Sequence, residues 1–279
     1  MNKPIEIAGT DVWLEGEGSH TVMLLHGWPD SPALWDSSVV ALQEGYRSVR
    51  FHLPGYACGK PSQPMSVVDT TDLISTIVDT VSPLEPVTLL LHDWGCLFGY
   101  EFAARHPHRV ARVIGVDIGA TGSNAFLKSL SARQKMMIAG YQLWLAMAWR
   151  LGSWAPGLAN RMTRFMARSL GCRNDPERIG WQMNYPYAMQ WLGDLGGLRG
   201  VLPVERLLGE RMPTLYVYGR RKPVMFHSPA WLEQLARAPG CAVHALDTGH
   251  WVMVHKPAEF NAIVRTWLDQ ATRSEGATS

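Results

Sequence analysis

Two ionisable residues stand directly after apolar runs: Asp93 in VTLLLHDWG (87–95) and His250 in ALDTGHWV (245–252). The first run is typical of a buried strand that turns at once into a helix, so Asp93 is expected on the sharp turn that presents a nucleophile above a sheet. A carboxylate there stays ionised because it faces the positive end of the helix dipole. An ordinary helix N-cap is the alternative interpretation of Asp93, since aspartate favours that position.

A base and an N–H donor are expected near the same point. His250 follows a strand and precedes the last helical stretch, so its imidazole can reach across the sheet toward Asp93. The segment MLLHGWPD (23–30) ends a further strand, and the backbone N–H of Trp28 can face the site. Each segment alone is compatible with an ordinary loop, but three such strand ends in this chain order favour a catalytic site.

The elements that must position these residues alternate along the chain. Short β-rich runs occur at 21–26, 46–53, 87–92, 109–119, 214–219 and 241–246, and helical stretches occur near 33–42, 70–81, 95–105, 229–237 and 257–270. This alternation predicts an α/β fold with a mostly parallel sheet. It stops between 120 and 203, where Gly, Pro and Asn separate several Trp- and Met-rich helices. We therefore expect a core of residues 1–119 and 204–279 with residues 120–203 inserted as a helical cap.

On these residues the chain resembles the α/β-hydrolase superfamily, and within it the aspartate-nucleophile branch of epoxide hydrolases and haloalkane dehalogenases. The motifs that carry the resemblance are HGWPD (26–30), PGYACGKP (54–61), HDWG (92–95) and GHWVMVHKPAEF (249–260). The resemblance covers residues 5–118 and 212–272, whereas the cap matches loosely. It implies an α/β-hydrolase fold, with a mostly parallel central sheet flanked by helices and an inserted helical cap.

The resemblance also implies a two-step mechanism. Asp93 attacks an electrophilic carbon of the substrate and forms an alkyl ester, and His250 then activates the water that hydrolyses this ester. The backbone N–H groups of Trp28 and Trp94 would stabilise the oxyanion of the second step. No metal and no organic cofactor is needed.

The acid that orients the histidine departs from the family pattern. Family members usually carry it in a G-x-x-D-P context, where this chain has GRRKP (219–223), with Lys222 at the acidic position. A lysine cannot hold the imidazole N–H, and its charge is expected to lower the pKa of His250. A variation within the branch moves the acid to the end of the strand after the nucleophile helix, which assigns Asp117 here. The alternatives are that Asp117 only caps a turn, or that the acid is absent and hydrolysis impaired.

The cap is expected to decide between the two chemistries of the branch. Opening an epoxide to a vicinal diol needs a proton donor, for which the neutral hydroxyl of a tyrosine is suited. The cap offers Tyr141, Tyr185 and Tyr187. A departing halide instead needs N–H donors, here Trp94 and a cap tryptophan such as Trp181. Trp28 replaces the asparagine of the dehalogenase motif, which favours the epoxide.

The composition limits the partners. Hydrophobic residues make up 47% of the 279 residues, and the formal net charge of +2 gives no basic stripe for nucleic acid. The N-terminus lacks an apolar signal region, and the longest apolar stretch (138–149) is shorter than the roughly 18 residues that cross a bilayer. We therefore expect a cytoplasmic protein with no membrane partner.

Cysteine usage and the cap complete the expectations. Cys58, Cys96, Cys172 and Cys241 form no C-x-x-C pair, which predicts free thiols in a reducing compartment and no metal site. The Met- and Trp-rich cap predicts a small hydrophobic or aromatic substrate. Either a monomer or a homodimer is compatible with the sequence. A non-hydrolytic binding or biosynthetic protein is the alternative from another class, because a fold does not fix a function.

Overall fold

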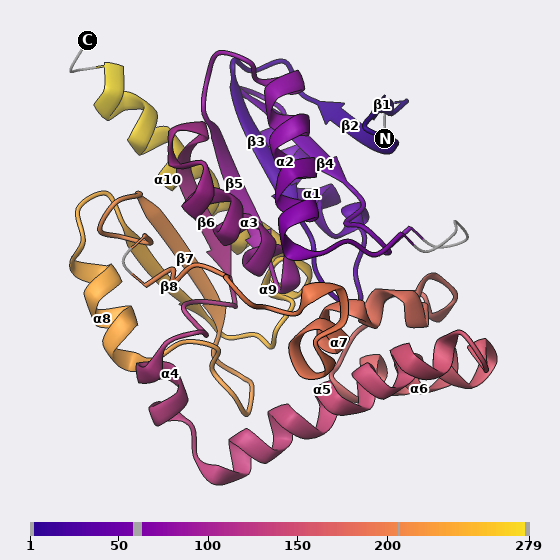
Figure 1. Cartoon of the computed structure of the whole chain (residues 1–279). Coiled ribbons are helices and arrows are strands. Elements are labelled where there is room, and N and C mark those ends of the chain that lie inside the picture. The colour runs from indigo at the N-terminus through magenta and orange to yellow at the C-terminus, as the bar shows by residue number, and fades with distance from the viewer. Residues whose placement is uncertain (1–2, 58–62, 206, 277–279) are drawn as a thin grey trace.

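A computed structural model describes residues 3–57, 63–205 and 207–276, and in these residues one eight-stranded sheet forms the centre of the molecule (Figure 1). The strands are β1 (Ile5–Ile7), β2 (Thr10–Glu15), β3 (His20–Leu25), β4 (Tyr46–Phe51), β5 (Val87–His92), β6 (Val110–Val116), β7 (Thr214–Gly219) and β8 (Ala242–Leu246). Their order across the sheet is β1-β2-β4-β3-β5-β6-β7-β8. The pairs from β4 to β8 are parallel, whereas β1 and β2 are antiparallel at one edge. The expected α/β fold with a mostly parallel sheet is confirmed.

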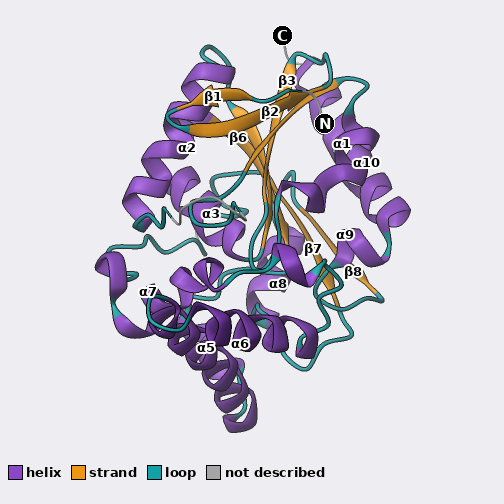
Figure 2. Cartoon of the chain, turned by 90° about the vertical axis from the view of Figure 1, so that its right-hand side faces the viewer, coloured by secondary structure: helices purple, strands orange, loops and turns teal. Residues whose placement is uncertain are grey.

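The helices cover both faces of this sheet (Figure 2). They are α1 (Asp36–Leu42), α2 (Val67–Val81), α3 (Trp94–Arg105), α4 (Asn124–Ser129), α5 (Ala132–Gly152), α6 (Pro156–Ser169), α7 (Tyr185–Leu192), α8 (Pro229–Arg237), α9 (Val252–His255) and α10 (Pro257–Gly276). Side chains of α1, α9 and α10 share one buried cluster, and those of α2, α3 and α8 share the other. In the described part of the chain, no helix is long and apolar enough to cross a membrane.

The central strands are apolar on both faces because each face is covered. Along β5, Leu89 and Leu91 pack into one cluster while Leu90 packs into the other, and all three are fully buried. Alternate side chains of a strand point to opposite faces, so the continuous apolar run of residues 87–92 is explained by two covered faces. The strand thereby holds its carboxyl end, and the turn that follows it, in a fixed place.

Helices α4 to α7 follow β6 and precede β7, and they form the layer at the lower end of Figure 1. Helices α5 and α6 lie side by side, and α7 packs against α5. This is the segment that the sequence analysis describes as an inserted cap, and the name is kept below for residues 120–203.

Two local features differ from the sequence expectations. The β1–β2 hairpin was not predicted, because both strands are short and meet at Ala8 and Gly9, which adopt positive φ. Helix α2 begins at Val67 rather than near 70, since the Ser66 side chain accepts a hydrogen bond from the Asp69 N–H and caps it earlier. Residues 58–61 of the PGYACGKP motif, Cys58 among them, lie outside the described residues.

Candidate active site

Asp93 occupies the turn between β5 and α3 with a positive φ of 53°. A non-glycine residue rarely adopts this conformation, which is typical of a strand-to-helix turn that exposes one side chain. Glycines on either side allow it: a Cβ on Gly27 would lie 2.5 Å from the Asp93 Cβ, and one on Gly95 would lie 2.4 Å from the His26 carbonyl oxygen. Helix α3 begins without a side-chain cap, so the carboxylate of Asp93 does not act as an ordinary N-cap.

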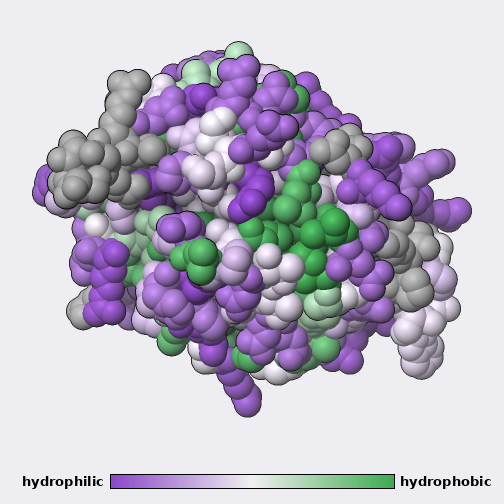
Figure 3. Space-filling model, turned by 90° about the horizontal axis from the view of Figure 1, so that it is seen from above, coloured by the Kyte–Doolittle hydropathy of each residue, from purple (hydrophilic) through white to green (hydrophobic). Residues whose placement is uncertain are grey.

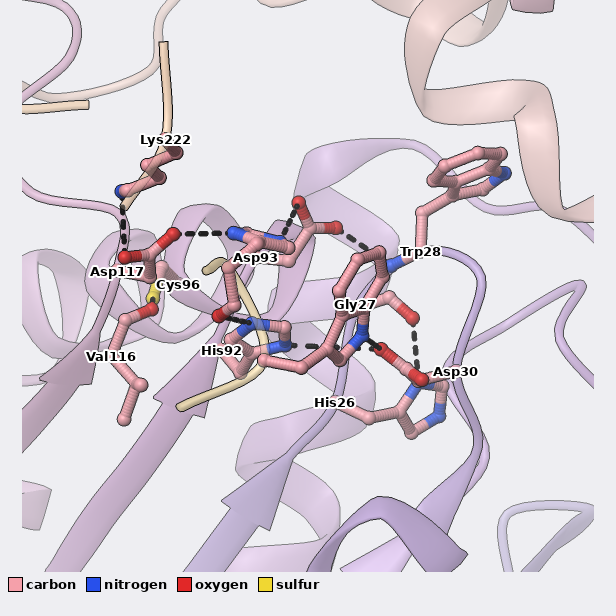
Figure 4. Close-up of polar contacts among 12 residues, drawn as sticks. His26, Gly27, Trp28, Asp30, His92, Asp93, Cys96, Val116, Asp117 and Lys222 are labelled. Carbon is pink, nitrogen blue, oxygen red and sulfur yellow. Dashed lines mark hydrogen bonds and ion pairs between the residues drawn. The ribbon is translucent and has the colours of Figure 1, made fainter. Parts of the chain in front are cut away.

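The Asp93 carboxylate has a different partner on each oxygen (Figure 4). The backbone N–H of Trp28 donates a hydrogen bond of 2.6 Å to Oδ1, and Nε2 of His250 lies 3.4 Å from Oδ2. Burial alone would raise the pKa of Asp93, but the neighbouring His250 and the Trp28 N–H outweigh it and lower the pKa. Asp93 is therefore an ionised carboxylate at neutral pH, with one oxygen held by the main chain.

Asp117 lies behind the histidine, at the end of β6, and is fully buried. Its Oδ2 is 2.5 Å from Nδ1 of His250, while its Oδ1 is 2.6 Å from Nζ of Lys222 and accepts the Gly219 N–H at 3.0 Å. Burial would raise the pKa of Asp117, but the charges of Lys222 and His250 outweigh it and hold the pKa well below its usual range. The chain thus brings together the three residues that the sequence analysis grouped as nucleophile, base and acid.

The pKa of His250 is raised on balance, not lowered as the presence of Lys222 led us to expect. Burial lowers the pKa of His250, yet the charge and hydrogen bond of Asp117, followed by those of Asp93, raise the pKa to about 9. The ammonium group of Lys222 pairs with Oδ1 of Asp117, the oxygen that does not contact His250. The lysine therefore compensates a fully buried carboxylate that would otherwise face one partly exposed histidine.

Two buried residues beneath His250 were missed by the sequence analysis. His92, at the end of β5, has its Nε2 3.2 Å from the His250 carbonyl oxygen, and burial lowers its pKa to about 3. A neutral His92 therefore donates this N–H, since a carbonyl oxygen only accepts. The position of His92 directly before Asp93 in the HDWG motif was the available signal.

Asp30 is the second missed residue, and it joins the core to the cap. Its Oδ2 accepts a hydrogen bond of 2.9 Å from the Trp251 indole, and its Oδ1 accepts one of 2.5 Å from Asn174 of the cap. Burial raises the pKa of Asp30 to about 6, although both hydrogen bonds oppose the rise. Asp30 fixes the residue next to His250, and its presence in the HGWPD motif was the signal for it.

Two of the three cap tyrosines predicted as donors lie at the site. Tyr187 contacts Trp28 and Trp94 edge to face, with ring centroids 5.7 and 5.2 Å apart, and Tyr141 lies 6.2 Å from Tyr187. Burial raises the pKa of both hydroxyls, and Asp93 contributes to each rise. Both tyrosines are therefore neutral at pH 7 and close enough to Asp93 to feel its charge.

The other predicted cap residues are placed elsewhere. Tyr185 packs against Tyr56 and Trp149, with ring centroids 6.1 and 6.2 Å away. Trp181 also packs on Trp149, at 5.2 Å, and lies against Gly152 of α5. Neither is brought to the group around Asp93. The sequence could not separate Tyr185 from Tyr187, because two positions so close in one short segment differ only in the face of the helix on which they lie.

One of the two indole N–H groups beside Asp93, that of Trp28, already has a partner. The Trp28 indole donates to Oδ1 of Asn184 at 2.8 Å, and Asn184 is itself fully buried. The Trp94 side chain, whose ring centroid is 5.2 Å from that of Tyr187, opposes the rise in the tyrosine pKa. The role of the Trp94 backbone N–H in binding an oxyanion stays a prediction.

Comparison with known proteins identifies the family of the chain. The family model described as "alpha/beta hydrolase fold" matches residues 20–257, and the chain belongs to that family. The structure is similar to an epoxide hydrolase from Bacillus megaterium, with a TM-score of 0.68 and 19% identity over 96% of this chain and 100% of the other. It is similar to a loop variant of a haloalkane dehalogenase from Bradyrhizobium elkanii, with a TM-score of 0.69 and 19% identity over 99% and 98%. At these identities the likeness concerns the fold.

Curated relatives match over different lengths. Bifunctional epoxide hydrolase 2 of Sus scrofa is 22% identical over 91% of this chain and 52% of its own length. The probable oxidoreductase EphD of Mycobacterium tuberculosis is 38% identical over 30% of this chain and 15% of its own length. The chain therefore spans about half the length of the pig protein and a smaller share of the mycobacterial one.

Proposed function

We propose that the protein is an epoxide hydrolase that opens a hydrophobic or aromatic epoxide to a vicinal diol through an ester on Asp93. The observation that carries the proposal is the arrangement of Asp93, His250 and Asp117 together with two neutral tyrosines, Tyr187 against Trp28 and Trp94 and Tyr141 beside it. A carboxylate on one side and hydroxyl donors on the other suit a substrate whose carbon is attacked while its oxygen becomes an alkoxide.

In the first step the Asp93 oxygen that the main chain does not hold attacks an epoxide carbon. Oδ1 accepts the Trp28 N–H, so Oδ2 is the attacking atom. The C–O bond of the ring breaks and the ring oxygen takes a proton from a tyrosine. Tyr141 accepts a hydrogen bond of 3.1 Å from Gln142, so its hydroxyl keeps its own proton for donation.

The second step uses His250 as a base, and ester formation in the first step lowers its pKa. In the free enzyme His250 is protonated at neutral pH, because Asp93 and Asp117 both raise its pKa. Ester formation removes the charge of Asp93, 3.4 Å from Nε2, so the pKa of His250 falls and the imidazole can take a proton from water. The proton that His250 loses returns to the tyrosine that donated in the first step. The water then attacks the carbonyl carbon of Asp93 and gives one proton to His250, while the Trp28 N–H stabilises the oxyanion. The ester C–O bond breaks, the departing oxygen takes the second proton of the water as a hydroxyl of the diol, and Asp93 is again a carboxylate.

Dehalogenation by the same Asp93 and His250 is the second candidate, and non-hydrolytic binding is the third. The dehalogenase candidate needs free indole donors for a halide, whereas the indole of Trp28 already donates to Asn184. This difference supports the epoxide. The free thiols of Cys96, Cys172 and Cys241 support a reducing, cytoplasmic setting.

The test is a trapped intermediate. Purified His250→Gln protein is incubated with a panel of aryl and alkyl epoxides and haloalkanes, and the peptide that contains Asp93 is analysed by mass spectrometry. The proposal predicts an adduct with the mass of a whole epoxide. An adduct equal to a haloalkane minus HX would establish the dehalogenase instead. Saturable binding with no adduct, from a protein shown to be folded, would support the non-hydrolytic candidate.

A further inference from the structure

The cap exposes far more apolar surface than the rest of the molecule. Fourteen of the nineteen exposed large hydrophobic side chains among the described residues belong to residues 120–203. The opposite end of the molecule, seen from above, is mostly hydrophilic around one compact hydrophobic area (Figure 3). Exposed apolar patches of this extent mark a surface that meets a partner.

These side chains gather on the outer side of α5 and α6. We define the cap face by the exposed side chains of Met136, Leu143, Met147, Trp154, Leu158 and Phe165. Along each helix its members are separated by seven or four residues, a spacing that places them on one stripe. The buried residues of α6, Ala159, Thr163 and Ala167, lie on the opposite stripe.

The two stripes form one continuous surface. Trp144 of α5 contacts Phe165 of α6, with ring centroids 6.1 Å apart, and its indole donates to the Met162 carbonyl at 3.0 Å. Trp154, in the turn between the helices, is 89% exposed. The α5–α6 layer lies at the end of the molecule that is farthest from both termini (Figures 1 and 2). The cap face can therefore meet a flat partner without interference from the sheet.

The charge of the same segment has one sign. Residues 131–170 contain six basic residues and no acidic one, and these are Arg133, Lys135, Arg150, Arg161, Arg164 and Arg168. Residues 120–203 carry ten Lys and Arg against three Asp and Glu, a net charge of +7, whereas the rest of the chain has a net charge of −5. On α6 the exposed residues Leu158, Arg161, Phe165 and Arg168 alternate between apolar and cationic.

We propose that the cap face docks on an anionic lipid bilayer, with α5 and α6 lying in the plane of the interface. Helices with aromatic and aliphatic side chains beside Lys and Arg bind at such interfaces through apolar burial and attraction to anionic headgroups. A second copy of this chain is a poorer occupant, since two caps of the same net charge repel each other. Nucleic acid would match the charge but leave the exposed Met, Leu and Phe side chains without a partner.

This inference goes beyond the proposed function and does not depend on it. The sequence expectation of no membrane partner rested on the lack of a spanning segment, and a helix that lies in the interface needs none. Docking there would bring the cap to the phase in which a hydrophobic substrate dissolves.

The test is flotation of the whole protein with lipid vesicles. One set contains phosphatidylcholine alone. The other contains about 30 mol% phosphatidylglycerol, an anionic content that gives a clear surface potential. We expect binding to the anionic vesicles, weak binding to the neutral ones and a loss of binding in high salt. The combined variant Met147→Ser, Trp154→Ser and Phe165→Ser should abolish it.

Two further variants keep the result interpretable. Leu84→Ser is the matched control, because Leu84 lies outside the cap and is 88% exposed. This variant should float like the wild type. Arg161→Gln with Arg168→Gln, which leaves the apolar side chains in place, should weaken binding by about 30-fold. The proposal would be overturned by wild-type protein that does not float with anionic vesicles, by equal binding of the triple variant, or by a dimer in solution that the triple variant converts to a monomer.

Discussion

The core and the cap contribute to the candidate site in different ways. The core supplies the three charged groups of the proposed mechanism, and each of these stands just after the carboxyl end of a strand: Asp93 after β5, Asp117 after β6 and His250 after β8. The cap supplies neutral hydroxyls, Tyr141 on α5 and Tyr187 on α7, and carries its charge on the outside. Strands with two buried faces fix the position of a residue that follows them, whereas a helical residue depends on how its helix is rotated against the sheet.

The first prediction removes the nucleophile of the core. Asp93→Ala should lower kcat by about 10⁴-fold or more, because no other carboxylate can form the ester. The measurement is the steady-state turnover of an epoxide found in the trapping screen, with the circular dichroism spectrum as the fold control. Residual activity within tenfold of the wild type would show that the chemistry lies outside the core site.

The second prediction concerns the acid behind the histidine. Asp117→Asn should lower kcat by roughly 10³-fold, since the amide no longer stabilises a charged imidazole. Lys222→Met is its companion and should cost about tenfold, with the acidic limb of activity moved to higher pH because the uncompensated Asp117 raises the pKa of the His250 base further. Full activity of Asp117→Asn at pH 7 would leave Asp117 as a structural residue.

The third prediction compares two positions of the cap that are two residues apart. Tyr187→Phe should lower kcat for epoxides by about 10²-fold through the loss of a proton donor, and Tyr185→Phe should change it by less than threefold. Both substitutions keep the ring, so the comparison isolates the hydroxyl. Equal losses from the two variants would mean that the cap acts through packing alone.

The smallest expected effect concerns the acid that links cap and core. The folded state raises the pKa of Asp30 from 3.8 to about 6, so Asp30 favours the folded state when protonated, and this contribution is lost as the pH rises through 6. Asp30→Asn should keep the Trp251 hydrogen bond while removing this dependence. The difference in the free energy of unfolding between this variant and the wild type should grow by roughly 2 kcal/mol in favour of the variant from pH 4 to pH 7. Urea unfolding at each pH measures it. A constant difference across that range would contradict the account.

The same contrast explains what the sequence could predict. The run at 87–92, the turn at Asp93 and the approach of His250 follow from strand pattern and chain order, whereas Asp117 was assigned from the family resemblance. The structure brings those three residues together. The sequence could not predict that Lys222 pairs with Asp117, because the loop after β7 has no periodicity that fixes its path. It also could not tell Tyr187 from Tyr185 or Trp181, since the rotation of α7 is set by packing against α5.

The most direct test of the central claim, an ester on Asp93, is a single turnover in water labelled with ¹⁸O, with enzyme in excess over epoxide. In the proposed mechanism the oxygen added to the product comes from the Asp93 carboxylate, and the labelled water replaces it there. The account predicts an unlabelled diol and ¹⁸O in the peptide that contains Asp93. A labelled diol with an unlabelled Asp93 peptide would show direct attack of water on the epoxide and would contradict it.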